Sequence, residues 1–151
     1  MSSRSPRYRW RRGSWRRSRS TTVAFRLTVS GWGATKPGSS DLSDRLMAAD
    51  VYVGQPKACD RVKHDYRSAN GPVICTENSY HPGADACQGD SGGPLTIEKG
   101  GRRYLAGILS YGANPEGNPT CALPDGFGIY THAHQYADWL RDVVGTVPSG
   151  S

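Results

Sequence analysis

One serine stands in a glycine-rich stretch that reads Ala86-Cys87-Gln88-Gly89-Asp90-Ser91-Gly92-Gly93-Pro94. Glycine adopts backbone conformations that residues with a Cβ atom avoid, so this loop can turn sharply around Ser91. Such a turn can aim the backbone N–H groups of Gly89 and Ser91 at one point, where they would hold an oxyanion. Asp90 directly precedes the serine and is an acid that the loop can bury. We therefore predict a catalytic site formed by Ser91, Gly89 and Asp90; an ordinary glycine-rich surface turn is the alternative.

A serine hydroxyl needs a general base that accepts its proton and an acid that orients this base. The chain has four histidines as candidates: His64, His81, His132 and His134. The first two lie in polar stretches, and the last two follow the serine. His132 and His134, with Asp138 after them, are a candidate metal-binding group, but an isolated His-X-His pair is weak evidence. We predict no metal ion and no other cofactor, and the base stays unassigned.

Cysteine spacing separates disulfides from metal sites. The chain has four cysteines and no Cys-X-X-Cys pair: Cys59, Cys75, Cys87 and Cys121. Three disulfide pairings are open, and two disulfides in an oxidising compartment fit better than a zinc site. A secreted protein is therefore expected, although no apolar signal segment is visible in the first 22 residues. No apolar run approaches the roughly 18 residues of a membrane span, so no membrane association is expected.

The basic charge is concentrated at the start of the chain. The net charge is +6, eight arginines lie in the first nineteen residues, and the first acid is Asp41. Without these arginines, eleven basic residues face thirteen acidic ones, so the remainder is close to neutral. We expect residues 1–22, rich in Arg and Ser, to be a disordered arm. A nucleic-acid-binding arm is one interpretation, because Arg with interleaved aromatic residues suits it. We favour the other, a non-native start of the chain, and expect no nucleic-acid partner.

Alternating apolar and polar residues predict short β-strands along the rest of the chain. The first series runs from Val23 to Val29 and the second from Met47 to Val53. Four further strands and a hairpin turn are expected; the strands lie at residues 72–75, 94–97, 104–111 and 126–131, and the turn at 99–102. Residues 104–111 are apolar almost throughout, which predicts a strand buried on both faces.

The periodicity changes at the C-terminal end. Tyr136, Leu140 and Val144 are four residues apart, which predicts an amphipathic helix of about ten residues. Six strands followed by one helix predict an all-β fold, a small antiparallel six-stranded barrel with the helix packed on its outside. This one domain is expected to span residues 23–147, with a tail at 148–151.

Five motifs follow one another in the order of a known family: VSGWG at 29–33, GDSGGP at 89–94, GILSYG at 107–112, GIYT at 128–131 and Trp-Leu at 139–140. Residues 23–145, which contain them, resemble the C-terminal barrel of the trypsin/chymotrypsin family of serine endopeptidases. The resemblance implies a trypsin-like hydrolase that cleaves proteins or peptides.

The resemblance also implies roles for single residues in substrate binding. Asp85, six residues before the serine, matches the acid at the floor of the trypsin pocket, where a carboxylate selects Arg or Lys side chains. Ser110 and Gly112 would bind the substrate backbone. Gly112 and Gly128, which lack side chains, would keep the pocket walls open.

Covalent links and one departure complete the resemblance. The family's disulfide pairing would join Cys59 to Cys75 and Cys87 to Cys121. Residues 113–120 form a longer link than is usual in the family, so the rim of the pocket is expected to differ.

The base and the orienting acid of this family come from an N-terminal barrel. None of the four histidines lies in the family's Ala-Ala-His-Cys setting, so we expect an incomplete chain that lacks this barrel and is inactive alone. In relatives, an apolar N-terminus created by cleavage pairs with the acid that matches Asp90. Without it, we expect Asp90 to turn toward solvent and the loop to relax. The alternative function is a catalytically inactive homologue that binds basic peptides.

Overall fold

The computed structural model describes residues 25–145. The expected arm at 1–22, the start of the first strand and the tail at 148–151 lie outside them. Six strands are present, close to the predicted positions: β1 (Arg26–Gly31), β2 (Met47–Tyr52), β3 (Val73–Glu77), β4 (Pro94–Lys99), β5 (Arg102–Ala113) and β6 (Phe127–His132). The helices are α1 (Pro56–Cys59), η1 (Asn78–Tyr80), η2 (Ala133–Tyr136) and α2 (Ala137–Val144). Neither α1 nor η1 is predicted from the sequence, because they have only four and three residues.

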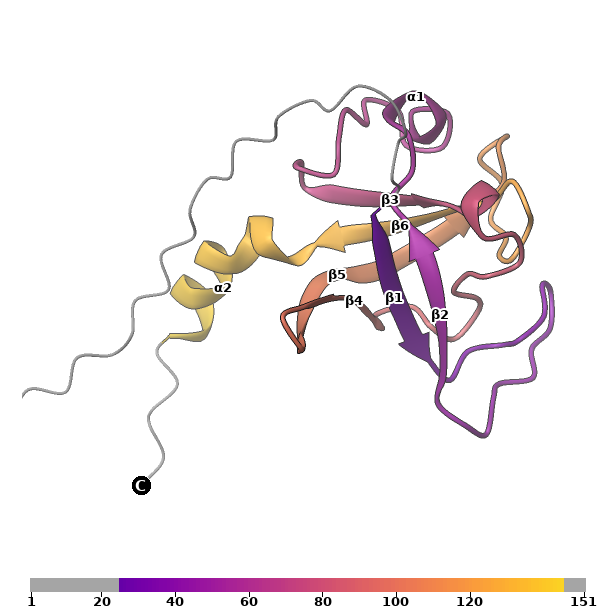
Figure 1. Cartoon of the computed structure of the whole chain (residues 1–151), viewed down its shortest axis with the longest axis horizontal. Helices are drawn as coiled ribbons and strands as arrows, with labels where there is room; N and C mark the ends of the chain where they lie inside the picture. Colours follow the sequence, from indigo (N-terminus) through magenta and orange to yellow (C-terminus); the bar gives the residue numbers. More distant parts are fainter. Residues whose placement is uncertain (1–24, 146–151) are drawn as a thin grey trace, which may run out of the picture.

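The strands form one antiparallel sheet in the order β2-β1-β4-β5-β6-β3 (Figure 1). The two end strands of this order meet where Val53 pairs with Thr76 and the Gly54 N–H donates to the Cys75 carbonyl at 2.9 Å. The sheet therefore closes on itself, and the all-β antiparallel barrel predicted from the sequence is confirmed.

Alternation along the strands places one set of side chains inside the barrel. The main core cluster contains eight buried residues, seven from the six strands and one from a loop: Leu27, Val29, Val51, Ile74, Leu95, Leu109 and Tyr130, with Ala86. Ala86 belongs to the segment that leads to the serine, so the core anchors this segment. A second cluster under α1 contains the disulfide between Cys59 and Cys75.

The turn between β4 and β5 has the geometry that its sequence predicts. Gly100 and Gly101 have φ angles of 60° and 71°. Two central residues with positive φ are what a two-residue hairpin turn of type I′ requires, and glycine adopts them without strain. The hairpin sets the register in which β4 continues from the serine segment.

The prediction that residues 104–111 are buried on both faces is wrong. Leu105 is 53% exposed and Tyr104 is 40% exposed, whereas Gly107 and Leu109 are buried. Only one face of β5 lines the barrel interior. A continuous apolar run does not show which of its residues have something packed on them.

The prediction that the terminal helix packs on the barrel is also wrong. The helix exists, but none of the residues of α2 is buried, and Trp139 is 59% exposed. In Figure 1, α2 extends away from the strands at the side opposite the long loops. The amphipathic pattern identified the apolar side of the helix correctly but carries no information about what covers it. Among the described residues, no helix has the length and apolar character needed to cross a bilayer.

Candidate active site

Two tight turns shape the segment around Ser91. The Asp90 N–H donates to the Cys87 carbonyl at 3.0 Å, and the Gly93 N–H donates to the Asp90 carbonyl at 2.8 Å. The φ angles of Gly89 and Gly92 are 93° and 81°, a region that residues with a Cβ atom rarely adopt. Ser91 lies between these glycines and is exposed to solvent.

The segment is fastened to neighbouring elements on both sides. Leu109 on β5 exchanges two backbone hydrogen bonds of 3.0 Å with it, accepting from Gly92 and donating to Gly93. A disulfide joins Cys87 to Cys121, the pairing that the family resemblance implies. These links hold Ser91 at the outside of the barrel in a defined place.

The N–H groups of Gly89 and Ser91 are open to a ligand. Neither has a hydrogen-bond acceptor among residues 25–145, and both residues are exposed. A Cβ atom on Gly89 would lie 2.6 Å from Leu42 Cδ2, so no larger residue fits at this point without a shift. Unpaired N–H groups beside a serine hydroxyl are the donors that stabilise an oxyanion in acyl transfer.

Asp90 does not turn toward solvent, which corrects the prediction made for it. Its Oδ1 accepts from the Gly33 N–H at 2.7 Å and its Oδ2 from the Cys87 N–H at 2.9 Å. A Cβ atom on Gly33 would lie 2.4 Å from the Asp90 carboxyl carbon, and one on Gly31 2.1 Å from Oδ1. Backbone N–H groups thus satisfy the partly buried carboxylate without an ammonium, in space that the two glycines leave free.

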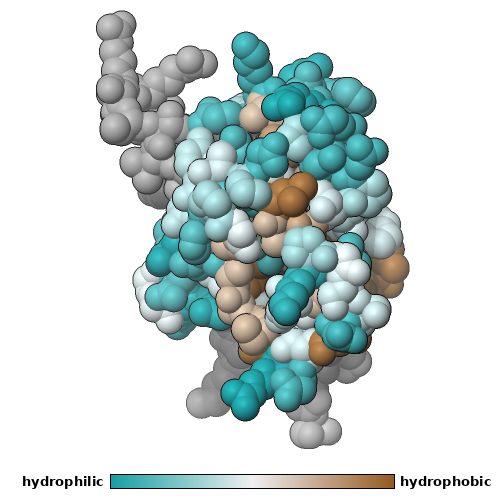
Figure 2. Space-filling model, turned by 90° about the vertical axis from the view of Figure 1, so that its right-hand side faces the viewer, coloured by the Kyte–Doolittle hydropathy of each residue, from teal (hydrophilic) through white to brown (hydrophobic). Residues whose placement is uncertain are grey.

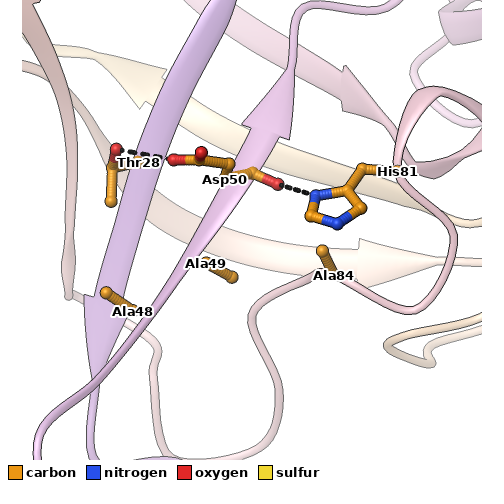
Figure 3. Close-up of a pocket in the computed structure, with 6 residues that line it drawn as sticks. All are labelled: Thr28, Ala48, Ala49, Asp50, His81 and Ala84. Atoms are coloured by element: carbon orange, nitrogen blue, oxygen red, sulfur yellow. Dashed lines mark hydrogen bonds between the residues drawn. The ribbon is translucent and has the colours of Figure 1, made fainter.

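A cavity of about 140 Å³ lies against this carboxylate. Asp85 and Asp90 line it together with Gly33 and small residues of β2 and the loop before Ser91, among them Ala49 and Ala84. A wider groove of about 400 Å³ shares this alanine lining, and Figure 3 shows Asp50 and His81 at its border. The cavity is thus lined by two carboxylates and by small side chains, three of which it shares with the groove: Ala48, Ala49 and Ala84.

Asp85 is held in the interior by hydrogen bonds and has no ion-pair partner among the described residues. Its carboxylate accepts from Asn78 Nδ2 at 2.9 Å, the Ala86 N–H at 2.8 Å and the Ala122 N–H at 3.0 Å. Desolvation by burial raises the pKa of Asp85 above its usual range, and these hydrogen bonds offset only part of the effect. The negative charge of Asp90 raises it further. A cation that reached Asp85 would therefore form an ion pair with a carboxylate that no cation of the described residues neutralises.

Asn78 contributes to the site, and no pattern in the sequence predicts its part. This buried residue donates both to Asp85 and to the Leu123 carbonyl, at 2.9 and 3.0 Å. Its own Oδ1 has no partner in the described part of the chain. A single polar residue at the start of a short 3₁₀ turn gives no signal in the sequence that it will face an acid seven positions later.

The two glycines predicted to keep a pocket open are packed against other atoms. A Cβ atom on Gly128 would lie 2.6 Å from Thr76 Oγ1, and one on Gly112 would lie 2.4 Å from the Thr120 carbonyl oxygen. Gly112 also accepts a hydrogen bond from the Thr120 N–H at 3.1 Å. Ser110, on the same strand, is exposed. A side chain at either glycine would collide with these atoms, and at Gly112 the colliding atom belongs to the longer link 113–120.

No histidine among residues 25–145 hydrogen-bonds to Ser91. His81 Nδ1 lies 3.1 Å from the Asp50 carbonyl oxygen, and His132 Nδ1 lies 2.9 Å from the Gly71 carbonyl oxygen. The His132 and His134 ring centroids are 6.3 Å apart, and the described residues contain no group of three metal-ligating side chains. Within residues 25–145, the exposed Ser91 therefore lies beside two N–H groups without acceptors and has no histidine bonded to it.

Comparison with known proteins places this geometry in a family. The sequence model of the trypsin family matches residues 8–140. Human kallikrein-8 is 35% identical over 83% of the chain and 44% of its own length. Trypsin zeta of Drosophila melanogaster is 36% identical over 77% of the chain and 39% of its own length. The venom protease of Bombus pensylvanicus is 38% identical, over 77% of the chain and 43% of its own length.

A solved structure agrees with the sequence comparisons. Mouse neuropsin, described as a serine protease expressed in the limbic system of the brain, superposes with a TM-score of 0.64 and 30% identity. The superposition covers 81% of this chain and 49% of that one. The chain thus spans less than half the length of the relatives it matches. With its serine loop, disulfides and barrel in the matched region, the chain belongs to the trypsin/chymotrypsin family of serine proteases.

Proposed function

We propose that the chain is the nucleophile-bearing barrel of a trypsin-like endopeptidase that cleaves after Arg or Lys. The observation that carries this proposal is the segment around Ser91: two closed turns, two N–H groups without acceptors and an exposed hydroxyl. Such a segment stabilises a tetrahedral intermediate but cannot take the serine proton. The base and its orienting acid therefore come from a second barrel, in keeping with the partial length over which relatives match.

Selection for Arg or Lys is assigned to Asp85. Its carboxylate is desolvated and has no cation beside it in the described residues. A guanidinium or ammonium of a substrate would neutralise it and replace the Asn78 and Ala122 donors.

Activation is assigned to the cavity beside Asp90. An apolar amino terminus would fit among Gly33 and Ala49, and its ammonium would reach the Asp90 carboxylate. The carboxylate already has two backbone donors, so the ammonium adds charge neutralisation to an ordered loop. An extracellular location is part of the proposal, because both disulfides require an oxidising compartment.

The test is assembly with the N-terminal barrel of a family member that carries a free apolar N-terminus. We expect hydrolysis of peptides after Arg or Lys to rise at least about a thousandfold over the chain alone, since the base and its acid are supplied. Ser91→Ala should abolish this hydrolysis, and Asp85→Ser should remove the preference for basic residues. The same barrel with an acetylated N-terminus is the control for the role of Asp90.

Three outcomes contradict parts of the proposal. Hydrolysis that survives Ser91→Ala excludes this serine as the nucleophile. Equal rescue by the free and the acetylated barrel excludes an ammonium at Asp90. A stable complex that binds basic peptides without cleaving them supports an inactive binding homologue instead.

A further inference from the structure

On one side, β5 extends beyond the end of its pairing with β4. β4 pairs with β5 only as far as Pro94 and Ile108, and Leu109 is then bonded to Gly92 and Gly93. β5 continues to Ala113, paired with β6 on its other side. An uncovered strand edge offers backbone N–H and C=O groups to an extended peptide.

The chain's own link between β5 and Cys121 covers this edge. Ala113 forms an antiparallel bridge with Pro119, and the Thr120 N–H donates to the Gly112 carbonyl at 3.1 Å. Gly112 and Thr120 are so close that only a residue without a side chain fits at 112. A peptide that reached β5 would find the Gly112 carbonyl already in use.

The covering segment is an ordered hairpin, residues 114–120, organised by Asn114. Its Oδ1 accepts from the Asn118 N–H at 2.8 Å and the Glu116 N–H at 3.2 Å. Its backbone N–H donates to the Asn118 carbonyl at 2.9 Å, and its carbonyl accepts from Gly117 at 2.9 Å. Residues 116–119 are exposed, so hydrogen bonds to the backbone and to Asn114, rather than packing, hold the hairpin in place. Loss of the Asn114 side chain would leave the N–H groups of Glu116 and Asn118 without an acceptor and would loosen the hairpin.

We propose that hairpin 114–120 competes with the substrate for Gly112 and thereby restricts recognition to the residue at the cleavage position. The proposal rests on the proposed function, since it concerns how the same site binds peptides. Asn114 is then a specificity-determining positioning residue: it acts on the substrate only through the hairpin. A closed hairpin gives an extended peptide no advantage over a single arginine derivative.

The experiment measures two dissociation constants by NMR titration of the full chain, for acetyl-Arg-amide and for acetyl-Ala-Ala-Arg-amide. In the unaltered chain we expect the longer peptide to bind less than about twofold more tightly. In Asn114→Ala its advantage should rise to about tenfold, which one or two backbone hydrogen bonds supply. Binding of acetyl-Arg-amide should stay unchanged. Glu116→Gln is the matched control, because only the Glu116 backbone bonds to Asn114.

Hydrogen exchange at the Thr120 amide shows whether the hairpin has opened. If Asn114→Ala leaves the hairpin closed, the peptides are tested on a second variant in which residues 114–118 are replaced by two glycines. If the Thr120 amide exchanges but the longer peptide binds no more tightly than acetyl-Arg-amide, the inference is wrong and the proposed function still stands. A tenfold advantage already present in the unaltered chain also overturns it. If neither peptide binds any variant, even in complex with a partner barrel, the proposed function fails and the inference with it.

Discussion

Two sides of the barrel differ in how well their side chains are satisfied. One is the loop end, which carries the segment 86–94 around Ser91, and the other is the side that carries α2. At the loop end, Asp90 and the turns around Ser91 have backbone partners, and the surface is mostly hydrophilic with small separate apolar groups (Figure 2). On the other side, Trp139, Val143 and Leu105 are each more than half exposed, and no residue of α2 is buried. The chain alone thus specifies the shape of the loop around Ser91, whereas its apolar helix face lacks a cover among the described residues.

The largest effect on stability is expected from removing the disulfide at the loop end. Replacing Cys87 and Cys121 by alanine should lower the unfolding free energy by about 4 kcal/mol, because their disulfide closes a 34-residue separation. Replacing Cys59 and Cys75, 16 residues apart, should cost about 3 kcal/mol. Denaturant unfolding measures both losses.

The two disulfides should differ more in their local effect. Amide exchange at Gly92 should rise only when Cys87 and Cys121 are replaced, since this pair ties the serine segment to the chain beyond β5. Equal exchange in both variants would mean that the hydrogen bonds to Leu109 alone hold the segment.

A second prediction tests the space around Asp90. Gly33→Ala places a Cβ atom 2.4 Å from the carboxyl carbon, so the carboxylate must leave both N–H donors. We expect a loss of about 2–3 kcal/mol in unfolding free energy, as for other overpacked sites. Gly71→Ala, whose nearest contact is an ordinary 3.6 Å, should be close to neutral and is the control. Equal stability of the two variants would show that the loop relaxes without cost.

A smaller effect should appear in the pH dependence of stability. The pKa of Asp85 is raised in the folded chain, so its stabilising contribution is complete below the ordinary aspartate pKa and is lost as pH rises through the folded value. The unfolding free energy should therefore fall on going from about pH 4 toward neutrality, and Asp85→Asn should flatten this slope. Asp125→Asn, at an exposed acid, should leave the slope in place. An unchanged slope in Asp85→Asn would show that burial of this carboxylate does not cause the pH dependence.

The smallest effect on folding is expected on the α2 side. Trp139→Ser should change the unfolding free energy by less than about 0.5 kcal/mol, because the side chain is 59% exposed. Leu95→Ala, in the core, should cost about 2–5 kcal/mol. Exposed apolar surface promotes association, so we expect the unaltered chain to form dimers or aggregates at micromolar concentration and Trp139→Ser to reduce them. A chain that light scattering finds strictly monomeric before any substitution would contradict this.

The same contrast explains what the sequence predicts well. Strand positions and the Gly100-Gly101 turn follow from local periodicity and backbone preference, and they are confirmed. The positions of Leu105 and Trp139 were misjudged because an apolar residue does not show whether anything covers it. Asp90 was expected in solvent because the sequence does not reveal that Gly33, far away in the chain, donates to it. Closure over Gly112 likewise depends on the fold of residues 114–120.

Mass spectrometry of Ser91 after treatment with an organophosphorus fluoridate tests the central claim most directly. The reagent marks a serine only when a base activates it beside working oxyanion donors. We predict no label on Ser91 in the chain alone and complete labelling once a partner barrel with a free N-terminus is bound. Labelling of the chain alone would place a base within it, and no labelling in a stable complex would show that Ser91 is not a nucleophile.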